Sequence, residues 1–251
     1  MINEAVVLAA GLSKRFRRDT GVYKVFADLD GFPLIAYPVI SLVSSGIERI
    51  IVVVNHVYGN KVVNVIEDIV HNKLGLDTDI AYVVNTRPEL GNGYSLYLAL
   101  PLLHTNRFIV SMSDHVYTPS IIDALKKSLS TVLGGDSTPK YIDVNEATRI
   151  QVEDECVVRV GKNITPYKYV DIGVHVLEKT LPFNECLKEP YEFSQLLTCF
   201  ASKRVIRVVD VKGSPWADVD TYDEYIRLTK GSSRIVIEEV KKEWRMRGIR
   251  I

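Results

Sequence analysis

Short apolar runs and segments with helical spacing alternate along the first half of the chain. The apolar runs, typical of buried parallel strands, lie at residues 5–9, 49–54, 80–84 and 108–111. Apolar residues recur at helical spacing in segments 33–45, 61–74, 94–103 and 120–133. Pro33 and Thr118-Pro119 are predicted to start helices, and Gly46 to follow a helix end. The alternation predicts an α/β fold with a Rossmann-like, mostly parallel sheet flanked by helices.

The pattern changes after the glycine pair at 134–135. Residues 140–152, 156–160 and 169–177 are strand-like, with turns expected at 161–163 and near Gly173. Helical patterns at 192–202 and 221–229 enclose a strand at 205–211. We expect a single domain in which residues 1–135 form the first half, 136–230 form a smaller mixed or antiparallel lobe, and 231–251 form a helical tail.

Composition narrows the class of protein. Lysine plus arginine and aspartate plus glutamate number 31 each among the 251 residues, so no net charge attracts nucleic acid. No apolar run reaches transmembrane length, and the early first strand leaves no room for a signal peptide, so we expect a cytoplasmic protein. Cys156, Cys186 and Cys199 are too widely spaced for a disulfide framework or a paired zinc motif, and we expect them to be reduced.

The loop that follows the first strand is suited to holding phosphate groups. Leu8 lies near the end of the apolar run, and Ala9, Ala10 and Gly11 place no large side chain over the backbone N–H groups. The guanidinium of Arg15 offers bidentate recognition of phosphate oxygens. The loop is neither a Walker loop nor a Rossmann G-x-G-x-x-G motif. These residues therefore indicate nucleotide binding, with an ordinary βα turn as the alternative.

Two further segments are candidates for the same site. Lys24 follows the loop and precedes apolar residues, although a solvated surface lysine is the common alternative. Asn92, Gly93 and Ser95 lie where a helix begins after a strand, and Gly93 allows a ligand to approach the backbone closely. A helix cap and turn would explain the same residues.

Aspartates at two strand ends point to a metal ion. Asp114 directly follows a buried strand, and Mg²⁺ usually takes one or two carboxylates together with phosphate oxygens of its substrate. Asp218 and Asp220 share one face of an extended segment, and Thr221 can begin the next helix. We expect Asp114 and one of this pair to hold Mg²⁺, with helix capping as the alternative for Asp220. His115 is expected to have a structural role.

Taken together, these segments resemble the sugar-phosphate nucleotidyltransferases with the nucleotide-diphospho-sugar transferase fold. The resemblance spans nearly the whole chain. Residues 92–96, 113–117 and 216–221 are similar to segments of the CTP:inositol-1-phosphate cytidylyltransferases of that superfamily. The sequence departs from the common pattern at Ser13 and Lys14, and residues 17–23 resemble an insertion. A similar loop occurs in molybdopterin nucleotidyltransferases, but those enzymes have a segment similar to Asp-Gln-Pro after the corresponding strand. This chain has Asp114-His115-Val116 there, which argues against that family.

The resemblance implies transfer of CMP from CTP to inositol 1-phosphate, giving CDP-inositol and pyrophosphate, with Mg²⁺ as the cofactor. It implies that Asp114 and Asp220 hold the metal. It also implies that Lys24 meets the α-phosphate, while Arg15 and the loop amides hold the outer phosphates. Residues 1–135 would bind the nucleotide and 136–230 the acceptor. Lys162 and Asp171 would meet the acceptor phosphate and a hydroxyl, or could equally be turn residues.

Other readings stay open. The enzyme could be another sugar-phosphate or phosphocholine nucleotidyltransferase that uses UTP, dTTP or GTP, and a non-catalytic nucleotide-sensing subunit is the alternative from a different class. A membrane-bound CDP-alcohol transferase could consume the product in phospholipid biosynthesis. The basic segment 234–251 is expected to be a helix packed on its own domain, with contact to an anionic membrane as the alternative.

Overall fold

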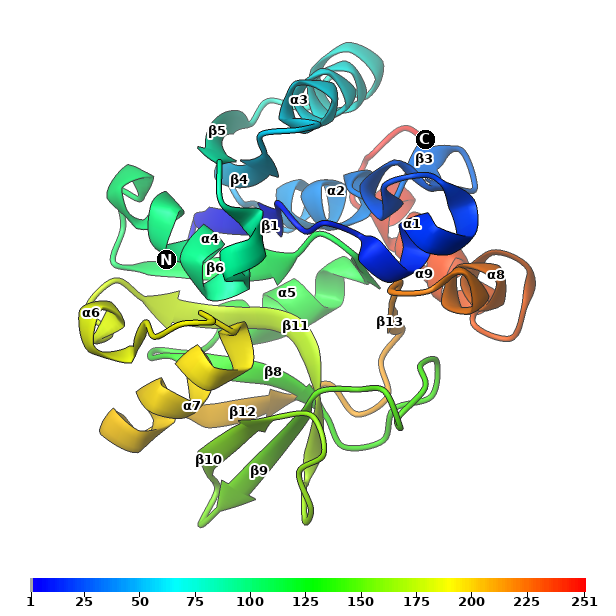
Figure 1. Cartoon of the computed structure of the whole chain (residues 1–251). Coiled ribbons are helices and arrows are strands. Elements are labelled where there is room, and N and C mark those ends of the chain that lie inside the picture. The colour runs from blue at the N-terminus through cyan, green and yellow to red at the C-terminus, as the bar shows by residue number, and fades with distance from the viewer. Residues whose placement is uncertain (1) are drawn as a thin grey trace.

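The computed structural model describes residues 2–251 and confirms the predicted α/β architecture (Figure 1). Four parallel strands run in the order β6-β1-β4-β5 in the main sheet. They are β1 (Glu4–Ala9), β4 (Arg49–Asn55), β5 (Asp79–Asn85) and β6 (Arg107–Met112). Every residue of β1 is buried, as expected for a central strand covered on both faces.

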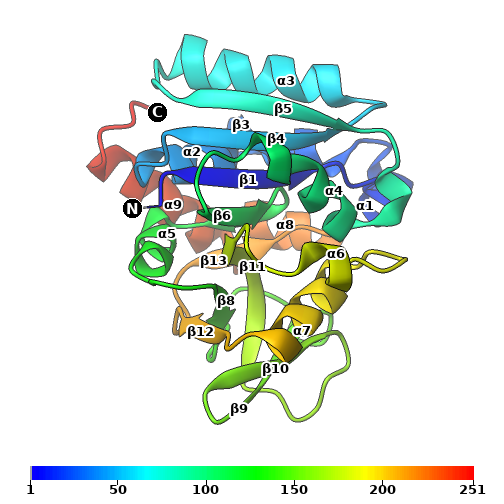
Figure 2. The same ribbon diagram turned by 90° about the vertical axis from the view of Figure 1, so that its left-hand side faces the viewer.

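Helices pack on both faces of this parallel part (Figure 2). One face is covered by α2 (Ala36–Ser44), α3 (Gly59–Glu67) and α5 (Pro119–Lys126). On the other face lies α4 (Asn92–Ala99), which packs beside Val6 and Val53. A π-helical segment, Asp68–Lys73, continues α3, and 3₁₀ turns at Pro88–Leu90 and Leu100–Leu102 flank α4. The carboxyl ends of the parallel strands therefore stay open for a site.

The second half extends the same sheet with antiparallel strands. β11 (Tyr169–Glu178) lies antiparallel to β6, and its other edge pairs with β8 (Val132–Asp136) and β9 (Arg149–Glu153). β10 (Cys156–Gly161) pairs with β9, and β12 (Arg207–Asp210) lies parallel to β8. This arrangement is the smaller mixed lobe that the strand-like pattern predicts.

Two predicted elements of this half are wrong in part. The helix predicted at 120–133 ends at Lys126, and residues 132–136 form β8 instead. A Cβ on Gly135 would lie 2.7 Å from Val208 Cγ1, so the glycine allows the two strands to pack closely. The strand predicted at 140–152 begins only at Arg149, because the apolar residues Ile142 and Val144 pack against the core from a loop.

The prediction that all cysteines are reduced is also wrong. Cys186 and Cys199 form a disulfide, with Cα atoms 5.5 Å apart, while Cys156 is free. Packing of α6 (Phe183–Cys186) on α7 (Phe193–Lys203) brings the pair together. A separation of 13 residues matches no local motif, so the spacing does not reveal a bond that tertiary packing creates.

A small ribbon and two helices complete the chain. β7 (His115–Tyr117) pairs antiparallel with β13 (Trp216–Asp218), and α8 (Tyr222–Lys230) follows. The last helix, α9 (Arg234–Met246), buries Val240 and Trp244 against the domain. Trp244 Nε1 donates to Ser41 Oγ at 3.0 Å. The basic tail is therefore a helix packed on its own domain, as expected.

The segment before α2 differs from the prediction. Pro33 lies in a two-residue strand rather than in a helical first turn, because Asp30 and Gly31 adopt positive φ and close a tight hairpin. This hairpin joins β2 (Asp28–Leu29) to β3 (Phe32–Pro33). Before it lie α1 (Lys14–Thr20) and a 3₁₀ turn at Lys24–Phe26.

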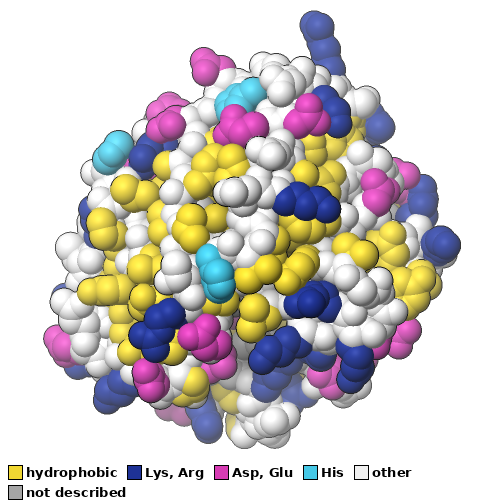
Figure 3. Space-filling model, turned by 45° about the horizontal axis from the view of Figure 1, so that its top comes forward, with side chains coloured by type: hydrophobic (Ala, Val, Ile, Leu, Met, Phe, Trp, Pro, Cys, Tyr) yellow, Lys and Arg dark blue, Asp and Glu magenta, His cyan; other side chains and the backbone are white. Residues whose placement is uncertain are grey.

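The surface agrees with the balanced composition. Acidic and basic side chains are interspersed on the face that Figure 3 shows. Across residues 2–251, the structure contains no helix with the length and apolar character needed to cross a bilayer.

Candidate active site

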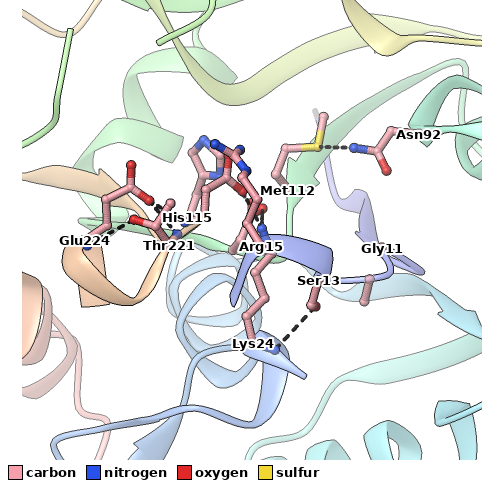
Figure 4. A network of polar contacts seen from close by, with 12 residues as sticks. Gly11, Ser13, Arg15, Lys24, Asn92, Met112, His115, Thr221 and Glu224 are labelled. Carbon is pink, nitrogen blue, oxygen red and sulfur yellow. Dashed lines mark hydrogen bonds and ion pairs between the residues drawn. The ribbon is translucent and has the colours of Figure 1, made fainter. Parts of the chain in front are cut away.

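Two adjoining cavities lie at the carboxyl ends of β1 and β6. Their volumes are about 240 and 330 Å³. Both are lined by Arg15, Asn92, Met112, Asp114 and Asp220, so these residues mark the junction where the two cavities meet. Figure 4 shows that side chains from α1, β6, α4 and the segment after β13 converge there, although they lie far apart in the sequence. This is the sheet edge at which parallel α/β folds bind ligands.

Lys24 lines the first cavity and pairs with two of the residues at the junction. Its Nζ pairs with Asp114 Oδ2 and, at 2.6 Å, with Asp220 Oδ1. Burial by itself lowers the pKa of Lys24, but attraction to the two carboxylates outweighs burial and raises that pKa above its ordinary value. For each aspartate, burial raises the pKa, but the neighbouring cations more than reverse the effect, so both pKa values are lowered. These cations are Lys24 for both residues, with His115 beside Asp114 and Arg15 beside Asp220. Lys24 and both aspartates are charged at neutral pH.

Arg15 adds a second positive charge on the other side of Asp220. Its Nη2 pairs with Asp220 Oδ2, and Nη1 lies 3.8 Å from Glu146 Oε2. The segment that resembles an insertion forms most of α1, which carries Arg15 at its first turn. The loop and the lysine segment are joined, since the backbone N–H of Lys24 donates to Ser13 Oγ at 3.3 Å.

The carbonyl groups of the loop after β1 accept hydrogen bonds from two side chains that lie beneath the loop. Tyr58 Oη donates to Ala9 O at 3.0 Å and to Gly11 O at 2.5 Å, and Asn55 Nδ2 donates to Ala10 O at 2.9 Å. In a trans peptide the N–H group points opposite to the carbonyl group. The N–H groups that follow these carbonyls therefore point away from Tyr58 and Asn55. The sequence analysis did not identify Tyr58 and Asn55 as residues of the site. A polar residue directly after the apolar run of β4 could have indicated Asn55.

The predicted loop residues divide into two groups. Leu8 and Gly11 line the first cavity, and a Cβ on Gly11 would meet no atom within 4 Å. Ala9 and Ala10 are buried beneath the loop. Their contribution is therefore backbone only.

The predicted segment at the start of α4 is also divided. Asn92 lines both cavities, and its Nδ2 lies 3.7 Å from Met112 Sδ. The N–H of Gly93 donates to Tyr191 O at 2.9 Å, and buried Ser95 accepts from Asn85 Nδ2 at 2.9 Å. The structure therefore places Asn92 in the cleft and the other two behind it, where they fix the start of the helix.

Thr221, and not Asp220, is the N-cap residue of α8. The N–H of Glu224 donates to Thr221 Oγ1 at 3.3 Å, and Glu224 Oε2 accepts from the N–H of Thr221 at 2.8 Å (Figure 4). This reciprocal capping box satisfies the helix start. Asp220 consequently has a free side chain, which turns to Lys24 and Arg15.

His115 is fixed beside Asp114. Its Nδ1 and Asp114 Oδ1 lie 2.7 Å apart, and its ring is stacked at 2° to the ring of Trp216. Burial lowers the pKa of His115, but Asp114 outweighs burial and raises the pKa to about 9. The imidazolium thus holds one oxygen of Asp114 while Lys24 holds the other.

Residues of the mixed lobe line the second cavity. Lys162 is exposed after β10, and Asp171 accepts from the N–H of Gly173 at 2.8 Å. The turn expected near Gly173 is a bulge within β11, where the pairing register with β8 shifts. A Cβ on Gly173 would lie 2.5 Å from His115 Nε2, so the bulge permits the histidine to enter. Asp218 faces the same cavity, and burial raises its pKa to about 6.

Within residues 2–251, no cluster of three or more histidine, cysteine or acidic side chains is arranged to hold a metal ion. The aspartate pair at the junction offers two carboxylates, the smaller number that Mg²⁺ takes when its substrate supplies phosphate oxygens.

Comparisons with known proteins identify a matching family and related proteins. Residues 5–138 match the family of MobA-like NTP transferase domains. A bifunctional IPC transferase and DIPP synthase from Thermococcus kodakarensis is 31% identical over 236 residues, covering 93% of this chain and 51% of that protein. The chain thus spans about half the length of the curated relatives it matches.

Solved structures share the fold. An inositol-1-phosphate CTP transferase from T. maritima is 29% identical and superimposes with a TM-score of 0.81, covering 100% of this chain and 98% of its own. A putative glucose-1-phosphate thymidylyltransferase from Bacillus anthracis has a TM-score of 0.73 at 16% identity, covering 90% and 93%. The nucleotide-diphospho-sugar transferase fold is therefore confirmed.

Proposed function

Because the chain belongs to the family of MobA-like NTP transferase domains, we propose that it transfers CMP from CTP to inositol 1-phosphate, releasing pyrophosphate. The observation that carries the proposal is the ion-paired group of Lys24, Asp114 and Asp220, whose two carboxylates line both cavities. One cavity is lined by the phosphate loop, and the other by groups suited to a phosphorylated polyol. A reaction that joins two phosphorylated substrates needs this arrangement.

In the proposed reaction the acceptor phosphate attacks the α-phosphorus of CTP in line, and pyrophosphate leaves. The attacking phosphate is already ionised, so the protein has to position charges rather than supply a nucleophile. Lys24 meets the α-phosphate, where negative charge develops. Arg15 and the N–H groups of residues 10 and 11 hold the outer phosphates of CTP.

Mg²⁺ fits the remaining requirement. Asp114 and Asp220 are the residues that would hold it, since their carboxylates adjoin both cavities. When bound, the ion supplies positive charge to the phosphate oxygens. His115 keeps the carboxylate of Asp114 oriented through their 2.7 Å contact.

The choice of inositol 1-phosphate rests on the second cavity and on the relatives. Lys162 supplies a cation for the acceptor phosphate, and Asp171 an oxygen for a ring hydroxyl. The T. kodakarensis and T. maritima proteins carry the names IPC transferase and inositol-1-phosphate CTP transferase. Phosphocholine has no hydroxyl to offer and should be a poor acceptor.

The choice of CTP rests on the segment at the start of α4 and on the same relatives. Asn92 is the polar side chain of that segment that reaches the cleft. The amide of Asn92 can donate to and accept from a pyrimidine edge. The neighbouring N–H of Gly93 is already bonded to Tyr191 O, so we assign the contact with the base to the Asn92 side chain.

The relatives named bifunctional also suggest where the product goes. We propose that CDP-inositol leaves the cytoplasm-facing site for a membrane-bound CDP-alcohol transferase, which places the reaction in phospholipid biosynthesis. Retention of the protein on vesicles that contain such a transferase, but not on plain anionic vesicles, would support this partner.

Product analysis tests the proposed function. The protein is incubated with Mg²⁺ and CTP, together with inositol 1-phosphate, glucose 1-phosphate or phosphocholine, and the products are identified by mass. We expect CDP-inositol as the main product, and none from Asp114→Asn. Faster turnover of glucose 1-phosphate, or of UTP, dTTP or GTP in place of CTP, would contradict the substrate assignment. Absence of turnover with every pair would favour a nucleotide-sensing role.

A thermal-shift screen supplies an independent measurement of nucleotide choice. A nucleotide present at about a hundred times its Kd stabilises the folded state by roughly 2.7 kcal/mol. We expect CTP with Mg²⁺ to raise Tm more than UTP, GTP or ATP at equal concentration. Equal shifts for all four would remove the support for CTP.

A further inference from the structure

Asp218 differs from the other acidic residues at the junction because its carboxylate has no partner. Asp114 pairs with Lys24 and His115, and Asp220 pairs with Lys24 and Arg15. Among residues 2–251, no side chain or backbone group makes a hydrogen bond or ion pair with the carboxylate of Asp218. Its oxygens are also not fully enclosed, since they border the second cavity. The group is therefore held at the cavity wall with its hydrogen-bonding capacity unused.

The position of Asp218 is fixed by the small ribbon. Asp218 in β13 lies directly across from His115 in β7. Alternation along the ribbon places Trp216 on the same face, while Val116 and Ala217 point into the buried core on the opposite face. The carboxylate thus cannot turn to another environment without breaking the ribbon.

The surroundings decide which ligand group the carboxylate can take. An ionised carboxylate only accepts hydrogen bonds, so the ligand must bring donors. A quaternary ammonium would be the cationic choice, but such groups need an open aromatic face. Trp216 is only 2% exposed and its ring is stacked on His115, so it offers none. Hydroxyl groups, which the proposed polyol acceptor carries, are donors of the required kind.

We propose that Asp218 binds hydroxyl groups of the acceptor and thereby selects phosphate monoesters of polyols with hydroxyls on neighbouring carbons. The inference rests on the proposed function and extends it from the reaction to the choice of acceptor. Two carboxylate oxygens side by side can accept from two adjacent hydroxyls. Asp171, on β11, lines the same cavity and can accept from a further hydroxyl. The metal-binding role expected for one aspartate of the pair then belongs to Asp220 alone.

The test compares Asp218→Ala and Asp218→Asn with the unmodified protein. The acceptors are inositol 1-phosphate and a set of deoxyinositol 1-phosphates that each lack one hydroxyl, all with CTP and Mg²⁺. We expect Asp218→Ala to lower kcat/KM for inositol 1-phosphate by about 10- to 100-fold, as for hydrogen bonds to a charged group. The KM values for CTP and Mg²⁺ should change by less than about threefold, since the proposed contact of Asp218 is with the acceptor and not with the nucleotide or the metal ion.

The deoxy series identifies the contact. For the analogues that lack a contacted hydroxyl, Asp218→Ala should lower kcat/KM clearly less than it does for inositol 1-phosphate, because a hydroxyl and its acceptor form one interaction. Asp218→Asn keeps the shape of the side chain and one acceptor oxygen. Its kcat/KM for inositol 1-phosphate should therefore lie between the values of the unmodified protein and of Asp218→Ala. Asp77→Asn is the control, since Asp77 is exposed and lines neither cavity, and it should leave the kinetic constants unchanged.

Three results would overturn the inference. Equal losses for every analogue in Asp218→Ala would mean a structural role. A large increase in the KM for Mg²⁺ would make Asp218 a metal ligand. Unchanged acceptor kinetics would mean that no hydroxyl contacts it. If the unmodified protein instead prefers glucose 1-phosphate, the proposed substrate fails, and the same comparison with deoxyglucose 1-phosphates still decides the role of Asp218.

Discussion

The two proposed ends of the cleft, one for the nucleotide and one for the acceptor, differ in how their charged groups are paired. At the nucleotide end, Lys24 and Arg15 are paired with Asp114 and Asp220 within the protein. At the acceptor end, Lys162 is exposed and the Asp218 carboxylate has no partner among residues 2–251. Charges that stabilise a transition state have to be fixed before the substrate arrives. Groups that select a substrate instead have to stay free to bind it, so the contrast separates chemistry from selection.

The two ends also differ in how they are built. The nucleotide end uses the carboxyl ends of the parallel strands β1 and β6, which are central and buried. The acceptor end uses a bulge in β11 and the two-stranded ribbon of β7 and β13. The Cys186–Cys199 disulfide joins the two helices that cover the mixed lobe. The lobe thus depends on irregular backbone and a covalent link, whereas the nucleotide end rests on regular strands.

The largest expected effect follows removal of a carboxylate at the nucleotide end. Asp114→Ala or Asp220→Ala should lower turnover by about a thousandfold or more, comparable with loss of a preorganised charge in other enzymes. Either variant should stay folded, because the other aspartate still pairs with Lys24. Steady-state kinetics and circular dichroism measure both. Turnover within about tenfold of the unmodified protein, or 1.4 kcal/mol of barrier, would refute the metal assignment.

Lys24→Ala should have the next largest effect. The charge of Lys24 is needed most when negative charge develops at the α-phosphorus, so kcat should fall more than the affinity for CTP. We expect kcat to decrease by about a hundredfold, comparable with loss of one oxyanion-type donor. Raised KM with intact kcat would instead assign Lys24 to ground-state binding. Arg15→Ala is the comparison variant, for which we expect both a lower kcat and a weaker affinity for CTP.

A smaller effect is expected from acidification of the acceptor end. Burial lowers the pKa of His175, a residue of β11 that lies 3.3 Å from Asp171, while His115 of β7 also opposes its charge. Asp171 acts in the opposite direction. The unfolded chain therefore takes up a proton near pH 6.5 before the folded protein does, and stability present above that pH is lost as the pH falls.

Urea unfolding of the unmodified protein and of His175→Gln between pH 7.5 and 5.5 measures this loss. We expect the unmodified protein to lose more stability than the variant over that range, because only the unmodified protein keeps a buried imidazole neutral while its unfolded chain takes up a proton. Equal pH slopes would show that His175 does not titrate as proposed. His115 and Asp218, whose pKa values are raised, also titrate differently in the folded and the unfolded chain. Both residues are present in the two proteins, so their contributions cancel in the comparison.

The sequence by itself determined the parallel half and the residue types of its site. Continuous apolar runs are typical of parallel strands in a sheet covered by helices, so β1, β4, β5 and β6 were predicted nearly to their ends, although β5 lies at the sheet edge and is only partly buried. The phosphate loop, Lys24, Asp114 and the segment 216–221 follow strand ends or helix starts, which local patterns reveal. Their convergence follows because the carboxyl ends of parallel strands meet at one edge.

Only the tertiary structure decided which polar groups are free and which are already bound. Thr221 rather than Asp220 caps α8, Gly93 is bonded to Tyr191, and Asp218 faces the cavity alone. The Cys186–Cys199 bond and the placement of Gly134 and Gly135 inside β8 were likewise not predicted. The physical reason is shared by all these cases. A hydrogen bond, a disulfide or a close approach depends on the partner that folding brings near, and that partner lies far along the chain.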